Sequence, residues 1–232
     1  MTHHPAGTST HVVDLTDEEI LGIDGPRSDQ VAPLPWAGRH TPEETELAAE
    51  VGLRSLVTRG ALDADEDGVR LPAELGDALD LRHGAKTIVY ADHSTPTTQE
   101  TRVLYIHPEA VLTESVNAAG VHRFRVGQLA DALADLGPWS EPQQHPGDDG
   151  HLDGDDLPAE LAGLQSVVCL DVVTLRSDDD VDTCSLTFYR LADDSVVEGI
   201  ETSSTLDLLP RNREQIHQRV IETVCGGMPR LT

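Results

Sequence analysis

The residues whose types and spacing best match a known chemistry form an acidic stretch at positions 63–74. The residues that fit its motif are Asp63, Asp65, Asp67, Gly68 and Glu74. Alternating carboxylates, a glycine for the sharp bend and a glutamate at the twelfth position are the pattern of an EF-hand calcium loop. Arg70 stands where that loop has an aliphatic residue, and Pro72 is expected to start the following helix early. The pattern therefore predicts either a calcium-dependent interaction protein or a solvated acidic turn.

Patterns typical of catalysis are absent from the sequence. There is no GxSxG elbow, no phosphate-binding GxxxxGK[ST] loop and no GxGxxG turn. The 11 histidines form neither HxxxH nor HExxH, so the ligand spacing of a zinc site is lacking. Asp171, beside Cys169 and Val173 in an expected strand, is a candidate for a buried catalytic carboxylate; an ion pair or a solvent-facing position are the alternatives. We therefore predict a protein that is not an enzyme and holds no cofactor.

The charge balance excludes several classes of partner. The 232-residue chain carries 16 Lys+Arg against 42 Asp+Glu, a net charge of −26. Nucleic acids and anionic membranes attract clustered basic side chains, whereas this chain has a single lysine, Lys86, and scattered arginines. Strong acidity instead suits solubility, a cation, or a basic or polar protein partner. Because only 3% of the residues are aromatic, we expect a core of Leu, Val and Ala.

Cysteine use and hydropathy indicate a cytoplasmic protein. Cys169, Cys184 and Cys225 form no CxxC pair and no even set, which favours a reducing compartment. Residues 1–16 lack the charged and apolar regions of a signal peptide. No run reaches the roughly 18 apolar residues of a membrane span, so no membrane insertion is expected.

Hydrophobic periodicity predicts helices and then strands in the first half of the chain. Thr41, Pro42 and Glu44 form a helix start with a capping box, and Gly60 ends that helix. A second short helix opens at Leu71, and strands are expected at 87–90, 102–106, 110–116 and 121–126, with a polar loop at 92–101 and a helix at 127–136. In the last of these strands, His122 and Phe124 share one face, and Arg123 and Arg125 share the other.

The second half of the chain repeats this order of elements. Leu157–Leu161 reproduces Leu71–Leu75 letter for letter. Strands are expected at 167–175, 184–189, 195–201 and 205–209, and a helix begins at Pro210 with the apolar stripe Ile216, Val220 and Val224. Corresponding segments lie about 80–86 residues apart, which is typical of an internal repeat. A duplication explains this order, and chance recurrence of a common pentapeptide is the alternative.

These elements predict an α+β fold with a mostly antiparallel sheet, helices on one face and a quasi-twofold internal repeat. We divide the chain into a loosely ordered segment at 1–40, a first α/β half at 41–137, an acidic Pro- and Gly-rich linker at 138–156, and a second α/β half at 157–232. The helices and turn at 46–80 also suit an acidic winged-helix-like regulator, although their acidic side chains would repel DNA phosphates.

The order of elements resembles the EspG family, cytosolic chaperones of ESX (type VII) secretion in actinobacteria. The similar features are the helix ending Val51-Gly52-Leu53, the turn 65–69, the helix at Leu71-Pro72, the strand 86–90 with its polar loop, and the terminal run 167–224. The resemblance covers residues 42–126 and 164–224. Where the family has a helical middle segment, this chain has the stretch 138–156.

The resemblance implies a non-enzymatic, quasi-twofold α/β protein that holds the apolar tip of a secreted helical partner, such as a helical heterodimer. It implies that the loop at 92–101 and the last helix contact this partner. The residues that it implies for the contact are His93, Ser94, Thr95, Thr97, Thr98, Gln99, Asn212, Gln215 and Arg219. The loop 93–99 is polar and uncharged, which independently suits adaptable hydrogen bonding to a partner, although a plain connecting loop has the same composition.

Overall fold

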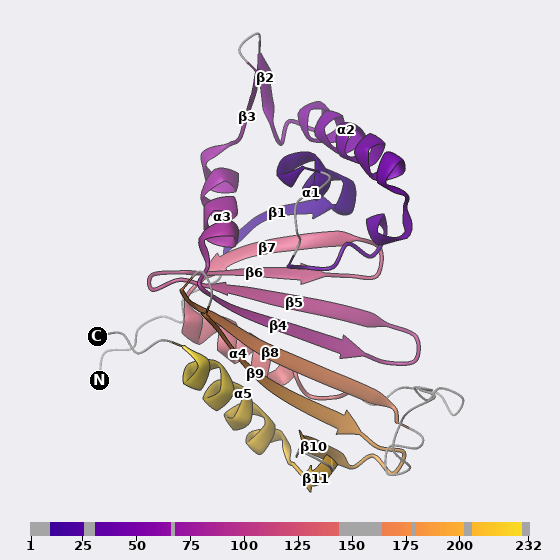
Figure 1. Ribbon diagram of the computed structural model, residues 1–232, viewed down its shortest axis with the longest axis vertical. Helices are drawn as coiled ribbons and strands as arrows, with labels where there is room; N and C mark the ends of the chain where they lie inside the picture. Colours follow the sequence, from indigo (N-terminus) through magenta and orange to yellow (C-terminus); the bar gives the residue numbers. More distant parts are fainter. Residues whose placement is uncertain are drawn as a thin grey trace.

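The computed structural model describes residues 10–25, 31–65, 68–143, 164–177, 180–201 and 206–228. Its helices are α1 (Asp17–Asp24), α2 (Pro42–Thr58), α3 (Ala73–Gly84), α4 (Leu129–Trp139) and α5 (Arg213–Gly227), with a short 3-10 turn η1 (Ala37–Arg39). Its strands are β1 (Thr10–Thr16), β2 (Asp63–Asp65), β3 (Gly68–Arg70), β4 (Thr87–Ser94), β5 (Gln99–Ile106), β6 (Val111–Val116), β7 (Val121–Gly127), β8 (Ser166–Ser177), β9 (Asp180–Arg190), β10 (Val196–Glu201) and β11 (Leu206–Pro210). Figure 1 shows their arrangement.

One antiparallel sheet runs through the whole molecule (Figure 1). Its strand order is β1-β7-β6-β5-β4-β8-β9-β10-β11, and β2 and β3 form a separate hairpin. The predicted α+β class with an antiparallel sheet is therefore confirmed. Buried and half-buried residues alternate along β4. This pattern indicates that one face of the strand is fully covered by packed helices and that the other face is only partly covered.

The sheet consists of two similar halves that meet at its centre. The first half runs β4-β5-β6-β7-α4 and the second runs β8-β9-β10-β11-α5, and β4 pairs with β8 where the halves join. Strand β6 begins at residue 111 and β10 at 196, while α4 begins at 129 and α5 at 213. Both offsets lie within the expected 80–86 residues. The second Leu-Pro-Ala-Glu-Leu copy at 157–161 lies outside the described residues.

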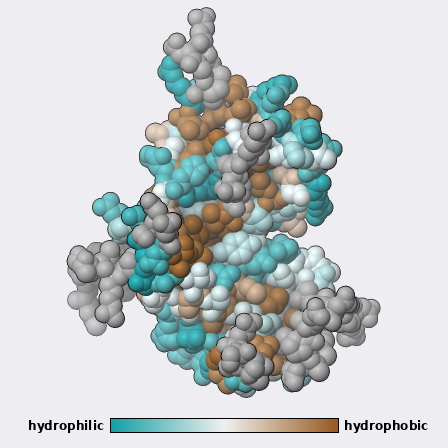
Figure 2. Space-filling view, in the orientation of Figure 1, coloured by the Kyte–Doolittle hydropathy of each residue, from teal (hydrophilic) through white to brown (hydrophobic). Residues whose placement is uncertain are grey.

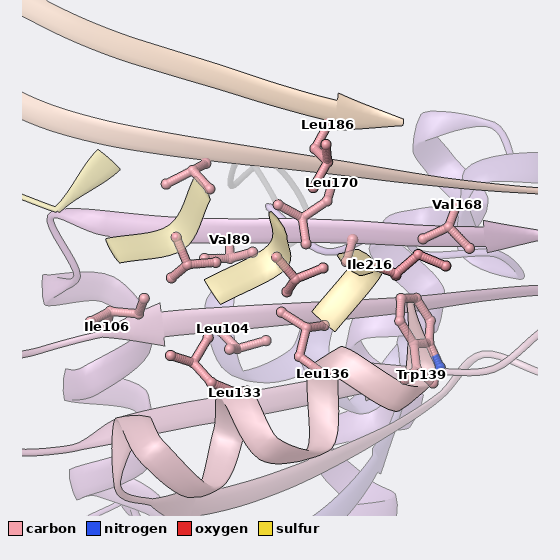
Figure 3. Packing of buried hydrophobic residues seen from close by; sticks show 14 of the residues in the cluster. Val89, Leu104, Ile106, Leu133, Leu136, Trp139, Val168, Leu170, Leu186 and Ile216 are labelled. Atoms are coloured by element: carbon pink, nitrogen blue, oxygen red, sulfur yellow. The ribbon is translucent and has the colours of Figure 1, made fainter. Parts of the chain in front are cut away.

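Helices α4 and α5 pack together on one face of the sheet. Their apolar stripes meet strands from both halves (Figure 3). Ile216, Val220 and Val224 of α5 are all buried, which confirms the predicted stripe. Leu133, Leu136 and Trp139 supply the matching side of α4. The helix continues through Pro138 to Trp139, so the first two residues of the expected linker 138–156 belong to α4.

The opposite face of the sheet carries the other three helices, which corrects the expectation that all helices share one face. Helix α3 and the strands β5, β6 and β7 bury a second apolar cluster there, together with residues from β1, α1 and α2. Val103 and Tyr105 of β5 point into this cluster, whereas Leu104 and Ile106 point to the α4–α5 side. Both faces of the first half are therefore covered.

Within the N-terminal segment 1–40, residues 10–25 and 31–40 are more ordered than expected. Strand β1 pairs with β7 at the edge of the sheet, and Thr16 caps α1 through a capping box with Glu19. Leu15 and Ile20 are among the most buried side chains of the described chain. The apolar-acidic piece at 12–16 suggests from sequence a strand or the cap of a brief helix, and the structure shows both, β1 and the Thr16 cap of α1. The apolar residues of this segment complete the second cluster.

The predicted polar loop at 92–101 is shorter than expected. Strands β4 and β5 extend through most of it, so only residues 95–98 connect them. Strands β8 and β9 likewise extend beyond the expected 167–175 and 184–189. Backbone pairing across the hairpins overrides the polar composition of these segments. Within the described ranges, no helix has the length and hydropathy needed to cross a lipid bilayer.

Candidate functional site

The β4–β5 hairpin ends in a turn of threonines that is fixed by its own hydrogen bonds. The Thr95 amide donates to the Thr98 carbonyl at 2.8 Å, and their two hydroxyl oxygens lie 2.7 Å apart. The Thr98 amide also donates to the Thr95 hydroxyl at 3.0 Å. A tip held in this way presents its remaining hydroxyls and methyl groups in a defined geometry.

The Asp92 carboxylate braces the base of this hairpin. It accepts hydrogen bonds from the Thr101 hydroxyl at 2.7 Å, the Gln99 amide at 3.0 Å and the Ser94 hydroxyl at 3.2 Å. Because these side chains leave the same face of β4 and β5, they stand on the side of the sheet that carries α1–α3. The negative charge of Asp92 is satisfied within the hairpin.

The hairpin forms one wall of an open hollow of about 570 Å³, which we call the hairpin hollow. Its other walls are the segment 33–39 and the β6–β7 turn. Its lining residues are Pro33, Pro35, Arg39, Ser94, Thr95, Thr97, Thr98, Gln99, Thr101, Val116, Asn117 and Ala118. Five of the predicted contact residues, at 94–95 and 97–99, therefore lie together.

Asp17 places the two other walls of the hairpin hollow. Its Oδ2 accepts from the backbone amides of Trp36 at 2.7 Å and Ala37 at 2.9 Å, which fixes the segment that contains Pro33 and Pro35. The Asp17 amide donates to the Gly120 carbonyl at 3.0 Å and so attaches the β6–β7 turn. Sequence reasoning missed Asp17, since nothing in its local pattern predicts contacts so far along the chain. The Thr16–Glu19 capping box was the available signal for α1.

A buried network of charges supports Asp17 from the sheet. His122 lies between Asp17 Oδ1 at 2.9 Å and Glu114 Oε1 at 2.7 Å. Glu114 Oε2 accepts from the Tyr105 hydroxyl at 2.6 Å and from Arg82 at 3.2 Å, and Arg82 also bonds Asp24. His122, Glu114 and Asp17 are fully buried. We call these residues the charge network.

Both ring nitrogens of His122 face a carboxylate, so both donate only when the ring is protonated. Burial alone would lower the pKa of His122, but the hydrogen bonds to Asp17 and Glu114 raise it above its ordinary value. Burial would raise the pKa of Glu114, yet the His122 and Arg82 partners lower it. The network is therefore a salt-bridged support that lies beneath the surface, with no opening for a substrate among its described contacts.

His93 does not belong to the hairpin hollow, contrary to expectation. Its side chain points to the α4 face, where it is buried and packs edge-on against Trp139 with ring centroids 5.6 Å apart. The Gln143 amide donates to its Nε2 at 3.5 Å. Burial lowers the pKa of His93, so the neutral ring is favoured. Side-chain alternation along β4 explains the difference, because His93 and Asp92 point to opposite faces.

The predicted residues of the last helix line a separate hollow of about 440 Å³. Asn212 caps α5 by accepting from the Gln215 amide at 3.0 Å, and the Gln215 side chain accepts from the Asn212 amide at 2.9 Å. Arg219 donates to the buried Glu198 carboxylate at 2.8 Å. These side chains already have structural partners, and the structure does not bring them into the hairpin hollow.

The acidic stretch 63–74 contains two short paired strands and the start of a helix. Asp63 pairs with Arg70 and Asp65 with Gly68 in the β2–β3 ladder, and Glu74 is exposed in the first turn of α3. Asp67 lies outside the described residues. The calcium site therefore stays a prediction. Across the described ranges, no group of three His, Cys, Asp or Glu side chains could hold a metal ion.

Asp171 also has a simple local partner. It is half-buried on β8, where it accepts a short hydrogen bond from the Ser185 hydroxyl on β9. The alternative of a partly solvent-facing carboxylate is the one observed. A serine beside a carboxylate with no histidine bonded to either is not the arrangement of an activated nucleophile. Cys169, Cys184 and Cys225 are free thiols.

The hairpin hollow is thus suited to contact rather than to chemistry. It presents proline and threonine carbon atoms, hydroxyls and one exposed cation, Arg39. The sequence matches no protein-family model and no curated protein. Its function must therefore be argued from these surfaces. An acid–base pair, which an active site would need, is not found among the residues that line this hollow.

Proposed function

We propose that this chain is a non-enzymatic, chaperone-like cytoplasmic protein that holds a helical protein partner at the hairpin hollow. The observation that carries the proposal is the composition of that hollow. None of its lining residues is acidic, although the chain carries 42 Asp+Glu and a net charge of −26. A surface kept free of carboxylates is where a neutral or apolar segment binds without charge desolvation.

The rigidity of the hollow supports the same function. The Thr95–Thr98 tip is fixed by internal hydrogen bonds and the facing segment is held by Asp17, so little conformational entropy is lost on binding. The hydroxyl and amide groups of Thr97 and Asn117 then supply directional hydrogen bonds. A helix tip offers unpaired backbone groups and apolar side chains of matching character.

The arrangement of the two halves also supports it. The EspG resemblance implies a quasi-twofold α/β protein, and the described sheet has two similar halves around the β4–β8 pair. On this basis we propose the partner class that the resemblance implies, a secreted helical protein held before type VII export. Partner contacts by the α5 hollow are left out of the proposal because Asn212, Gln215 and Arg219 are engaged within the chain.

Site-specific photo-crosslinking in native host cells tests this proposal. A benzoylphenylalanine residue at Thr97 should form a covalent adduct with a helical protein, identified by mass spectrometry. The matched control places the same group at Thr58, an exposed threonine on α2, where we expect no such adduct. Thr97→Glu should then weaken binding of the purified partner by about tenfold, because it adds a desolvated charge at the contact. Equal adducts at Thr97 and Thr58, or no protein adduct at Thr97, would contradict the proposal.

A further inference from the structure

The α4 side of the first half carries two neighbouring rows of side chains that differ from the rest of this acidic surface. In one row, strand pairing sets Arg102 of β5, Ser115 of β6 and Arg123 of β7 side by side. In the next row, Thr113 of β6 stands beside Arg125 of β7. We call these five residues the arginine shelf. Adjacent strands lie about 4.8 Å apart and successive residues on one face about 6.8 Å, so the three arginine positions flank the two hydroxyl-bearing positions.

Two of the three arginines are not neutralised by an ion pair. Arg125 is exposed, and neither it nor Arg102 forms a salt bridge within the described residues, while Arg123 pairs with Asp14 at 3.1 Å. Arg102 is half-buried and lies over the Trp139 ring, 5.0 Å from its centroid. Burial lowers the pKa of Arg102, since its charged form has lost part of its water. The Asp135 and Glu100 charges oppose this lowering and the Arg125 charge adds to it. Because neither carboxylate forms a salt bridge with Arg102, a bound anion would offset the remaining cost of burying its charge.

A cavity of about 400 Å³ lies over the shelf, between the sheet and α4. Gln128 and Ala132, from the start of α4, line it, and no side-chain hydrogen bond caps this helix. The positive end of the helix dipole therefore adds to the charge of the arginines. The apolar part of the lining includes Leu104, Leu136 and Trp139.

Charge distribution distinguishes this cavity from an ordinary solvated surface. The chain has 16 Lys+Arg in 232 residues, and three of them line this one cavity. The two acidic lining residues, Glu100 and Asp135, are exposed at its rim and form no salt bridge with the arginines. In a chain with a net charge of −26, cations without a salt bridge beside the half-buried Thr113 and Ser115 point to a ligand rather than to solubility.

We propose that the arginine shelf binds a small molecule that carries an oxyanion group, a phosphate or a carboxylate, beside a short apolar body. The oxyanion lies between Arg102 and Arg125, accepting from their guanidinium groups and from the Ser115 and Thr113 hydroxyls. The apolar body packs against Leu104 and Trp139. The cavity has the volume of a small-molecule site. It shares Thr101, Val116 and Asn117 with the lining of the hairpin hollow, so the two sites are neighbours, but the arginines of the shelf line only the cavity and Arg39 lines only the hollow.

Fluorescence titration of the full chain tests this site. Trp36, which is exposed, is replaced by phenylalanine so that the signal comes from Trp139. Phenyl phosphate and benzoate are the probes, with inorganic phosphate lacking the apolar body and benzyl alcohol lacking the charge. We expect saturable binding of at least one aromatic anion at millimolar concentration or below, weaker binding of inorganic phosphate, and no saturation with benzyl alcohol. The tighter of the two aromatic anions identifies the oxyanion.

Arg125→Gln and its matched control decide where the probe binds. Arg125→Gln should weaken binding by about tenfold or more, because a charge-assisted contact is lost, and Arg125→Lys should weaken it less. Arg54→Gln, at an exposed position on α2, should bind as the parent does. Unchanged thermal unfolding shows that each variant is folded. Failure of both aromatic anions to saturate, or equal binding by the Arg125→Gln and Arg54→Gln variants, would overturn the proposal.

Discussion

At the residue scale, the hairpin hollow depends on side chains that do not line it. Asp17 bonds two backbone amides of the 33–39 segment, and His122 holds Asp17 in place from the sheet. The prediction from sequence could place His122 and Phe124 on one face of a strand, which the structure confirms. It could not find Asp17, because its partners lie 19, 20 and 105 residues away along the chain.

Gly120 is the residue at which a single methyl group should disturb the hollow. Its φ of +71° is unfavourable for other residues, and an added Cβ would lie 2.8 Å from Asp17 Oδ1. We expect Gly120→Ala to destabilise the fold by about 1–3 kcal/mol in chemical denaturation. Gly76→Ala on α3, where a Cβ meets nothing within 4 Å, is the control and should stabilise by about 0.5–1 kcal/mol. Equal changes in stability at both glycines would contradict the proposed clash between a Cβ at position 120 and Asp17.

Replacing His122 should destabilise the fold, because the carboxylates of the charge network then lack their cation. His122→Gln keeps a polar side chain but leaves Asp17 and Glu114 without the imidazolium that lies between them. We expect a loss of about 3–5 kcal/mol in the free energy of unfolding at neutral pH, because buried carboxylates lose a cation. His11→Gln is the control, since His11 is exposed and its carboxylate contact is to the partly exposed Asp14, outside the charge network, and it should cost far less. A small effect at His122 would mean that water replaces the ring.

The same residue should make stability depend on pH. The pKa of His122 is raised above 6.5, so its stabilisation is complete below that value and is lost as the pH rises through the folded-state pKa. The pKa of Glu114 is lowered below 4.5, so its contribution is lost only as the pH falls through that lower value. The difference in melting temperature between the parent chain and His122→Gln should therefore be larger near pH 6 than near about pH 9. A constant difference would contradict the assignment.

At the scale of elements, periodic segments were predictable and the edge of the sheet was not. The Thr41–Glu44 capping box and the α5 stripe are local signals, and both elements form as expected. Strand β1 is short, and its pairing with β7 joins residues more than a hundred positions apart, so composition alone suggested a loose segment. The contact residues at 94–95 and 97–99 follow from one hairpin and were found together. The facing segment 33–39 depends on tertiary contacts and was missed.

Helix α5 offers a test that separates a structural role from partner contact. Asn212→Ala removes the cap that accepts from the Gln215 amide, and should destabilise the fold by about 1 kcal/mol. The midpoint of urea unfolding measures this change. Gln218→Ala, an exposed position in the same helix, is the control and should have little effect. Photo-crosslinking from Thr97 should be unaffected by Asn212→Ala. If the folded Asn212→Ala variant no longer formed the crosslink, α5 would have to be counted as part of the partner-binding surface.

At the scale of the whole molecule, the two halves share one sheet but differ in the helices that cover it. Helices α4 and α5 close the central strands on one face, and α1–α3 cover the first half on the other. Hydrophilic residues spread over much of the visible surface, with smaller hydrophobic patches between them (Figure 2). Acidic side chains far outnumber basic ones, so self-repulsion opposes the compact state. Neutral hollows and an arginine cavity on such a molecule are local exceptions that the fold must maintain against this repulsion.

This repulsion predicts that salt stabilises the chain. Raising sodium chloride from about 0.05 M to about 0.5 M shortens the screening distance several-fold, so the melting temperature in calorimetry should rise. Asp77 and Asp80, exposed three residues apart on α3, contribute like-charge repulsion of about 0.2–0.5 kcal/mol. Replacing both by asparagine should therefore stabilise the chain at low salt and reduce the response to salt. The double variant removes two surface charges and leaves the charge network intact. If its melting temperature rose with salt as steeply as that of the parent chain, or more steeply, salt would not be acting through repulsion on the acidic surface.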